Sequence, residues 1–223
     1  DLYNIEILVI NDGSTDNSKK VLDGLVEMNW IKAINLEKNE GACVARNLGA
    51  KEANGKYLSF LPADAILYPG MARIWYEMLE EHPDHDFLYG GYRFIDEDGE
   101  PLPGNDMFFQ PFNPYLLEVT NYIDGSFPIR TTAFWKYAKL MNQSEGLWDK
   151  NIKSLQDWDF WLSVTRNGGK GIYIPDIFFG TTMPHPGGLS FDSANNWLDR
   201  TEAIKKKHGI PLRKLCVASL GAG

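Results

Sequence analysis

The stretch Ile5–Asp16, which reads IEILVINDGSTD, decides how the chain folds. Its first half is a run of apolar, mostly β-branched residues, the pattern of a strand that is buried on both faces of a parallel sheet. The run ends at a turn in which Gly13 can take a positive φ, and Ser14 or Thr15 can then cap a helix. Ligands of open α/β sheets bind beyond the carboxyl ends of the strands, so Asp12 is predicted to lie on the rim of a ligand crevice. The alternative is an aspartate that satisfies its own turn.

The chain continues this alternation of strands and helices as far as Leu79. After a first helix with apolar positions between residues 21 and 26, we expect a strand at 31–36, a helix at 42–53, a strand at 57–61 and a helix that begins near 69. This order predicts an α/β fold with a doubly wound, mostly parallel sheet that is flanked by helices.

The rhythm changes in the second half, where we expect a smaller mixed region. The predicted elements are a strand at 87–95, a hairpin turn at 96–99, a loop over the crevice at 102–113, a strand at 126–130, helices at 131–140 and 157–166, a short strand at 171–174 and a helix at 193–207. No repeat or linker divides these elements, so we interpret residues 1–223 as one domain.

The composition narrows the classes of partner. The formal net charge of −8 argues against a nucleic-acid polymer, although a bound divalent cation would still allow a diphosphate ligand. Two cysteines, Cys43 and Cys216, form no disulfide framework and favour a reducing, cytoplasmic compartment. No apolar run reaches the roughly 18–20 residues that span a bilayer, and association with the inner face of a membrane stays open.

Four motif blocks, in this order along the chain, resemble those of family 2 glycosyltransferases, which have the GT-A fold. The blocks are NDGSTD around Asp12, GACVARNLG around Arg46, FLPADA around Asp64 and QDWDFWL around Asp157. The resemblance covers roughly residues 5 to 190. It implies an inverting glycosyltransferase that moves a sugar from a nucleoside-diphosphate sugar, UDP- or GDP-linked, to a hydroxyl of a glycan, lipid-linked or other acceptor by metal-assisted direct displacement.

The resemblance assigns three residues to the donor. Asp12 accepts a hydrogen bond from the nucleotide base, and Arg46 pairs with Asp12 or reaches the base and phosphates. Asp64 holds the Mn²⁺ or Mg²⁺ ion that neutralises the diphosphate, although Pro62 and Ala65 stand where the family's motif has further acids. The alternatives are a salt bridge on the surface of a helix for Arg46 and an ordinary surface carboxylate for Asp64.

The fourth block supplies the chemistry. Asp157 is the implied catalytic base, and Gln156 replaces the first acid of the family's motif. A carboxylate that only complements the positive end of a helix is the alternative. Trp158 is a candidate acceptor-side residue, with a packed core aromatic as its alternative. His185, in a late loop, is a candidate for the acceptor side, the diphosphate or the metal, unless it only bonds to backbone.

Within this scheme, residues 1–95 form the nucleotide-sugar-binding part, 96–190 the acceptor and catalytic part, and 191–223 a C-terminal helix and tail. The family's first strand, which lies beside the strand at 5–10, has no counterpart in the sequence. An empty slot would leave backbone groups unpaired, so either the sequence is a fragment or rearranged form, or another segment fills the slot. We expect the strand-like tail at 215–220 to do so, in the manner of a circular permutation. The rival function is a non-catalytic module of the same fold that binds a sugar nucleotide or a glycan.

Overall fold

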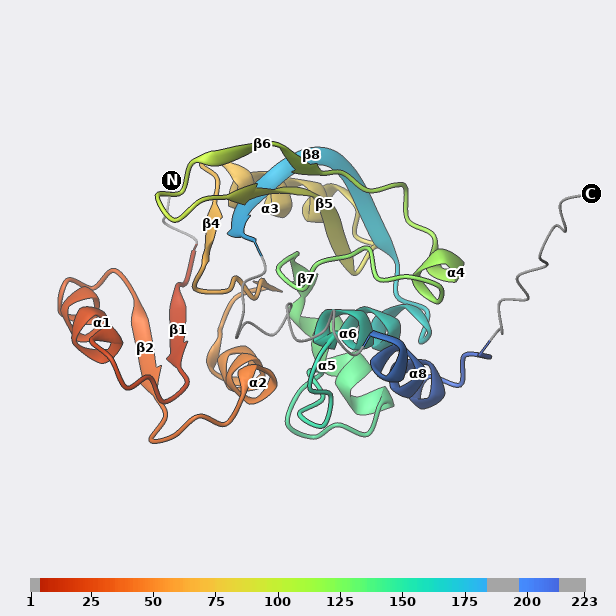
Figure 1. Cartoon of the computed structure of the whole chain (residues 1–223), viewed down its shortest axis with the longest axis horizontal. Helices are drawn as coiled ribbons and strands as arrows, with labels where there is room; N and C mark the ends of the chain where they lie inside the picture. The colour runs from red at the N-terminus through yellow and green to blue at the C-terminus, as the bar shows by residue number, and fades with distance from the viewer. Residues whose placement is uncertain (1–4, 184–196, 213–223) are drawn as a thin grey trace, which may run out of the picture.

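The chain folds into an α/β structure with two separate sheets, one formed by β1 and β2 and the other larger and curled (Figure 1). The computed structural model describes residues 5–183 and 197–212. The first part consists of β1 (Leu8–Asn11), α1 (Ser18–Glu27), β2 (Lys32–Asn35) and α2 (Ala42–Glu52). β1 and β2 pair in parallel, as predicted, with Val9 opposite Ala33. α2 packs against β1 and leads the chain into the second sheet.

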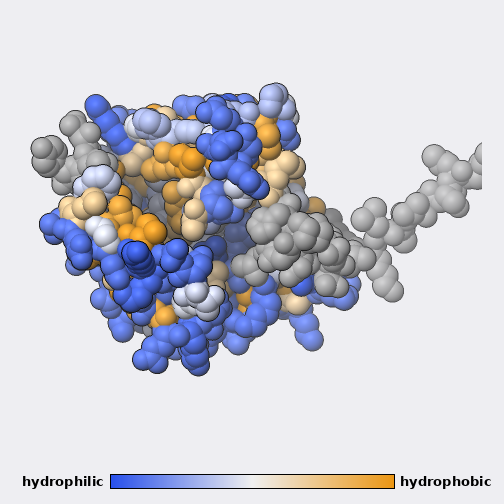
Figure 2. All heavy atoms as spheres, turned by 60° about the vertical axis from the view of Figure 1, so that its left-hand side comes forward, coloured by the Kyte–Doolittle hydropathy of each residue, from blue (hydrophilic) through white to orange (hydrophobic). Residues whose placement is uncertain are grey.

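The strand at the start of the chain forms, but it is less buried than predicted. Leu8, Val9 and Ile10 are half-buried, and Ile5 and Ile7 are 44% and 47% exposed. β1 is less buried because it has a strand on one side: within residues 5–183 and 197–212, β1 pairs with β2 alone. Figure 2 brings this side of the molecule forward and shows apolar surface between polar side chains. The tail expected beside β1, residues 215–220, lies outside the described residues.

The N-terminus of α1 also differs from the prediction. Asn17 occupies the cap position in place of Ser14 or Thr15, and the carboxylate of Asp16 accepts a hydrogen bond from the backbone N–H of Ser18 (2.9 Å). The backbone N–H of Ser14 donates to the side chain of Asn11 (3.1 Å), so that Ser14 belongs to the preceding turn.

The second sheet is mixed, not mostly parallel. Its strands lie in the order β3 (Tyr57–Leu58), β7 (Ile129–Arg130), β5 (Phe87–Ile95), β8 (Gly171–Thr182) and β4 (Ala65–Leu67), and β6 (Pro101–Met107) adds to β5. β5 and β8 run parallel, and the other pairs of this sheet are antiparallel. The α/β class is therefore confirmed, but hairpin and return connections replace the continuous parallel winding.

Two segments form more strand than the sequence predicts. The expected loop at 102–113 begins as β6, which tolerates its prolines because it lies at the sheet edge. β8 was expected to end before Pro175, yet it continues to Thr182. Its register against β5 shifts between Tyr89 and Gly91, and this irregularity accommodates the proline.

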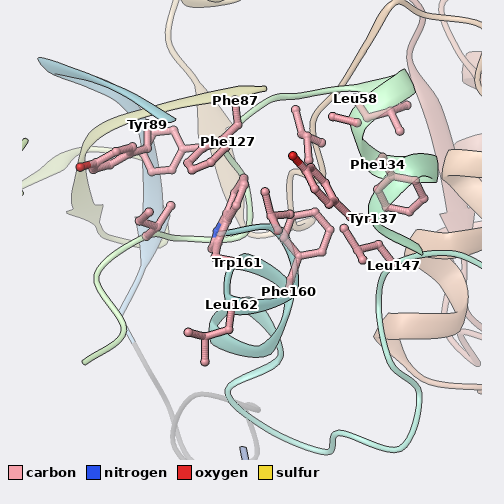
Figure 3. Close-up of a cluster of buried hydrophobic side chains, with 14 of the residues drawn as sticks. Leu58, Phe87, Tyr89, Phe127, Phe134, Tyr137, Leu147, Phe160, Trp161 and Leu162 are labelled. Carbon is pink, nitrogen blue, oxygen red and sulfur yellow. The ribbon is translucent and has the colours of Figure 1, made fainter. Parts of the chain in front are cut away.

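Helices cover the sheets, and one of them lies in the core. They are α3 (Met71–Glu81), α4 (Pro114–Leu117), α5 (Thr131–Leu140), α6 (Gln156–Thr165) and α8 (Trp197–Lys207). Every residue of α6 from Trp158 to Thr165 is buried. Its rings stack into an aromatic cluster (Figure 3), with Trp161 4.5 Å from Phe87 between ring centroids. Among the described residues, no helix is both long enough and apolar enough to cross a membrane.

Candidate active site

Asp157 lies in the first turn of α6, at the end that emerges from the aromatic core. Its half-buried carboxylate accepts hydrogen bonds from Nδ2 of Asn121 (2.8 Å) and from the backbone N–H of Trp158 (2.9 Å). Burial and the negative charge of Asp124 raise the pKa of Asp157 to about 6, against the opposing effects of its two hydrogen bonds and of Arg46. A carboxyl group with this pKa is ionised at neutral pH and still basic enough to take a proton.

The loop before β7 contributes two residues, Asn121 and Asp124, that the sequence did not point to and that act on Asp157. Gly125 lets this loop approach Asp157: a Cβ on Gly125 would lie 2.7 Å from the ring of Trp148 and 3.4 Å from Cβ of Asp157. The sequence signal was weak, because a short polar loop before a two-residue strand has no periodicity. A carboxylate and an amide just upstream of a predicted strand were the available hint.

Arg46 joins α2 to the start of α6. Its Nη1 donates a hydrogen bond to Oε1 of Gln156 (3.0 Å), and its guanidinium carbon lies 4.4 Å above the ring of Trp148. Among the ion pairs between described residues, none includes Arg46 or Asp12. The guanidinium is thus held by an amide and an aromatic face rather than by a carboxylate.

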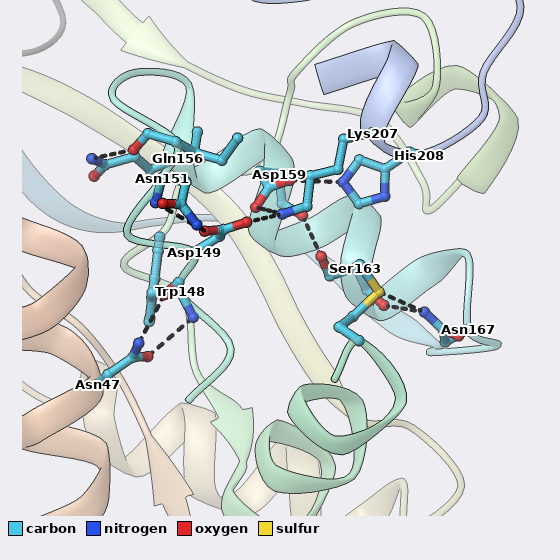
Figure 4. Close-up of polar contacts among 12 residues, drawn as sticks. Asn47, Trp148, Asp149, Asn151, Gln156, Asp159, Ser163, Asn167, Lys207 and His208 are labelled. Atoms are coloured by element: carbon cyan, nitrogen blue, oxygen red, sulfur yellow. Dashed lines mark hydrogen bonds and ion pairs between the residues drawn. The ribbon is translucent and has the colours of Figure 1, made fainter. Parts of the chain in front are cut away.

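Asn47, the next residue along α2, fixes the loop beneath Arg46 (Figure 4). Its buried side chain donates to the backbone carbonyl of Trp148 (2.8 Å) and accepts from the N–H of the same residue (3.0 Å). Gly146 packs so closely on Asn47 that a Cβ would lie 2.3 Å from the amide oxygen. Asn47 therefore supports the loop that carries Trp148.

Asp12 binds the segment that leads into α2. Its two carboxylate oxygens accept from the backbone N–H groups of Glu40 (2.7 Å) and Gly41 (2.9 Å). Gly13 follows with a φ of +69°, and a Cβ there would lie 2.4 Å from the carbonyl carbon of Lys38. Asp12 therefore shapes the start of α2, one turn before Arg46, and its contact with a nucleotide base stays a prediction.

Asp64 is exposed in the loop between β3 and β4. One of its oxygens accepts from the hydroxyl of Thr182 at the end of β8 (2.8 Å). Within residues 5–183 and 197–212, no group of three or more histidine, cysteine, aspartate or glutamate side chains could hold a metal ion. The other candidate ligand, His185, lies outside the described residues.

Two neighbours of Asp157 on α6 point away from it. Trp158 is fully buried and donates its indole N–H to the carbonyl of Leu117 (2.6 Å), so its ring packs in the core and presents no open face to a sugar. Asp159 is also buried and accepts from Nζ of Lys207 (2.7 Å) and Nε2 of His208 (2.8 Å). Lys207 also pairs with Asp149 (2.8 Å), and this network attaches α8 to α6 (Figure 4).

The sequence model of the protein family "Glycosyl transferase family 2" matches residues 1–138, more than half of the chain. The chain belongs to glycosyl transferase family 2. An "Uncharacterized glycosyltransferase" of Rickettsia felis is 32% identical to it over 170 residues, which are 75% of this chain and 26% of the relative. This family 2 glycosyltransferase chain therefore spans about a quarter of the length of that relative.

Solved structures confirm the GT-A fold of this family 2 chain. The S. aureus TarS fragment 1-349 in complex with UDP-GlcNAc has a TM-score of 0.67 and 18% identity, with 92% of this chain and 57% of that fragment covered. The mannosyltransferase PcManGT from Pyrobaculum calidifontis, in complex with GDP-Man and Mn²⁺, has a TM-score of 0.56 and 15% identity, covering 91% of this chain and 53% of PcManGT. At these identities the likeness is one of fold.

Proposed function

We propose that the protein transfers a sugar, with inversion, from a nucleoside-diphosphate sugar to an acceptor hydroxyl, and that Asp157 is the general base. The observation that carries this proposal is the environment of Asp157: a half-buried carboxylate with a pKa of about 6 at the start of a rigid helix. In the reaction, the acceptor oxygen forms a bond to the anomeric carbon, and Asp157 takes the hydroxyl proton. The bond between the anomeric carbon and the diphosphate breaks, and the nucleoside diphosphate leaves.

The donor site lies on the α2 side of Asp157 in this proposal. Arg46 supplies a positive charge and forms no ion pair with a described carboxylate, which suits the phosphates of the donor. Asp12, which holds the entry to α2, would accept from the base. The UDP- and GDP-sugars bound to TarS and PcManGT support a donor of this class.

A divalent ion fits this site if the donor provides most of its ligands. Asp64 offers an exposed carboxylate with one described side-chain partner, and Mg²⁺ is often bound by one or two carboxylates together with substrate phosphates. Asp64 would hold Mn²⁺ or Mg²⁺ in this way, as would His185 if its loop reaches the site. When bound, the ion would offset the charge of the leaving diphosphate.

Release of nucleotide from a panel of UDP- and GDP-sugars, measured with and without Mn²⁺, tests the proposal. Asp157→Asn should bind the donor as the wild type does and lose turnover by at least about 10²-fold, the usual contribution of a general base. Asp23→Asn, a change at an exposed aspartate on α1, is the matched control and should keep full activity. Turnover retained in Asp157→Asn would refute the role of the base. Donor binding without turnover in the wild type would favour the non-catalytic binding module.

A further inference from the structure

The amide of Gln156 makes two different hydrogen bonds at the start of α6. Its Oε1 accepts from Nη1 of Arg46 (3.0 Å), and its Nε2 donates to the backbone carbonyl of Ile152 (3.1 Å). A carboxylate at this position could accept from Arg46, but it has no hydrogen to donate to the carbonyl of Ile152. The pair of contacts therefore fits an amide and not an acid.

The contact with Arg46 sets the charge of the site. A glutamate at position 156 would form an ion pair with the guanidinium, whereas the neutral amide orients it and leaves its full positive charge. Trp148, whose ring lies 4.4 Å beneath the guanidinium carbon, gives a second restraint that is also uncharged. Arg46 is thus fixed in place by two neutral groups.

Gln156, which holds Arg46, directly precedes Asp157 in α6, and the charge of Arg46 is close enough to act on the base. Burial and the negative charge of Asp124 raise the pKa of Asp157, whereas the hydrogen bond from Asn121 and the charge of Arg46 lower it. On β5, the negative charge of Asp157 contributes to the raised pKa of Tyr92. Arg46 is the cation in this set, and Gln156 is its hydrogen-bond acceptor.

We propose that Gln156 is a positioning residue that acts through Arg46: it holds the guanidinium beside Asp157 and keeps its charge available to the base and to the donor diphosphate. The inference rests on the proposed function, in which Asp157 takes the proton of the acceptor. It adds a reason for the amide at position 156, where the family's motif has an acid.

Titration of the Asp157 carboxyl carbon by NMR tests the proposal without any substrate. Gln156→Met keeps a side chain of similar length and removes both hydrogen bonds. We expect the titration midpoint of Asp157 to rise by about half a pH unit, because Arg46 is no longer held near it. Gln156→Glu should raise the midpoint by about one pH unit, because the new carboxylate neutralises Arg46 and adds a negative charge next to the base.

Two further proteins separate this role from a structural one. In an Arg46→Met background, Gln156→Met should produce no further rise, since its effect passes through the guanidinium. Asn167→Met is the matched control: Nδ2 of Asn167 also donates to a carbonyl four residues earlier, that of Ser163 (2.8 Å), at the other end of α6. This variant should leave the midpoint of Asp157 unchanged.

A midpoint that stays unchanged in Gln156→Met while Tm falls would overturn the proposal, as would an equal rise with and without Arg46. The acid limb of nucleotide-sugar hydrolysis should move with the NMR midpoint in each variant. If the midpoints move as expected but no donor is turned over, the positioning role stands and the proposed function fails. If Asp157→Asn abolishes turnover but the midpoint of Asp157 does not change in the Gln156 variants, the proposed function stands and the positioning role of Gln156 fails.

Discussion

Replacement of the proposed base should stabilise the fold while it abolishes activity. The folded-state pKa of Asp157, about 6, lies above the ordinary aspartate value of 3.8, so the folded protein binds this proton more tightly than the unfolded chain does. Stability therefore decreases as pH rises from about 4 to about 6, and the cost persists at higher pH. A difference of about two pKa units corresponds to about 3 kcal/mol.

Asp157→Asn removes this cost, because the amide stays neutral at every pH. The gain in the free energy of unfolding should be smaller than this cost of about 3 kcal/mol, since a neutral amide accepts weaker hydrogen bonds than a carboxylate does. The Nδ2 of Asn121 now donates to the carboxylate, while its buried Oδ1 has no partner among the described residues. Rotation of this side chain would let Oδ1 accept from the substituted amide, so that the site can adapt.

We expect a gain of about 1–2 kcal/mol at pH 8, which corresponds to a Tm higher by roughly 2–8 °C for a chain of this size. At pH 4 the wild-type carboxyl group is protonated in the folded state, and the two proteins should unfold at similar temperatures. Thermal unfolding of both proteins across this pH range is the assay. A Tm difference that does not change between pH 4 and pH 8 would refute the raised pKa on which the argument rests.

Three further perturbations test the site and its support. Asp124→Asn removes a negative charge that raises the pKa of Asp157, so the acid limb of kcat/KM should move below pH 6, by up to about one unit; a limb that stays or moves upward would contradict this. Asp64→Ala should abolish the Mn²⁺-dependent part of donor binding in calorimetry, and unaltered metal dependence would dismiss Asp64 as a ligand. Lys207→Met leaves the buried carboxylate of Asp159 with His208 as its remaining charged or basic partner among the described residues, and urea unfolding should show a loss of about 3 kcal/mol; an unchanged midpoint would exclude the network as a restraint.

The spacing of apolar residues predicted those helices and strands that can be recognised from their own residues. The β5 strand (Phe87–Ile95) and the α5 helix (Thr131–Leu140) have the predicted bounds, because a continuous apolar run and a helical period need no partner to be recognised. Whether two strands pair in parallel or antiparallel was harder to predict from the sequence. The antiparallel pairing of β7 with β3 depends on residues more than seventy positions apart, and no short-range pattern encodes it.

The same distinction applies to the site. Motif similarity singled out Asp157 and Arg46 as candidates, and in the structure Arg46 binds Gln156, the residue before Asp157. It did not identify Asn121, which acts on Asp157 from a loop 36 positions away in the sequence. It also left the partner of Asp159 unknown, because Lys207 is 48 positions distant and becomes a neighbour only when α8 docks on α6.

The rest of α6 explains how the fold tolerates an unfavourable charge in its first turn. The helix buries Trp158, Phe160, Trp161, Leu162 and Val164 almost completely. Full burial of one large apolar side chain contributes about 1.5–3 kcal/mol, so two of these residues offset the cost of about 3 kcal/mol for ionised Asp157. These buried side chains of α6 thus do more than fill the core: they hold the first turn rigid while the carboxylate of Asp157 remains in surroundings that raise its pKa. A truncation in this part of the helix, such as Phe160→Leu, should therefore lower the free energy of unfolding while the pKa of Asp157 stays nearly unchanged.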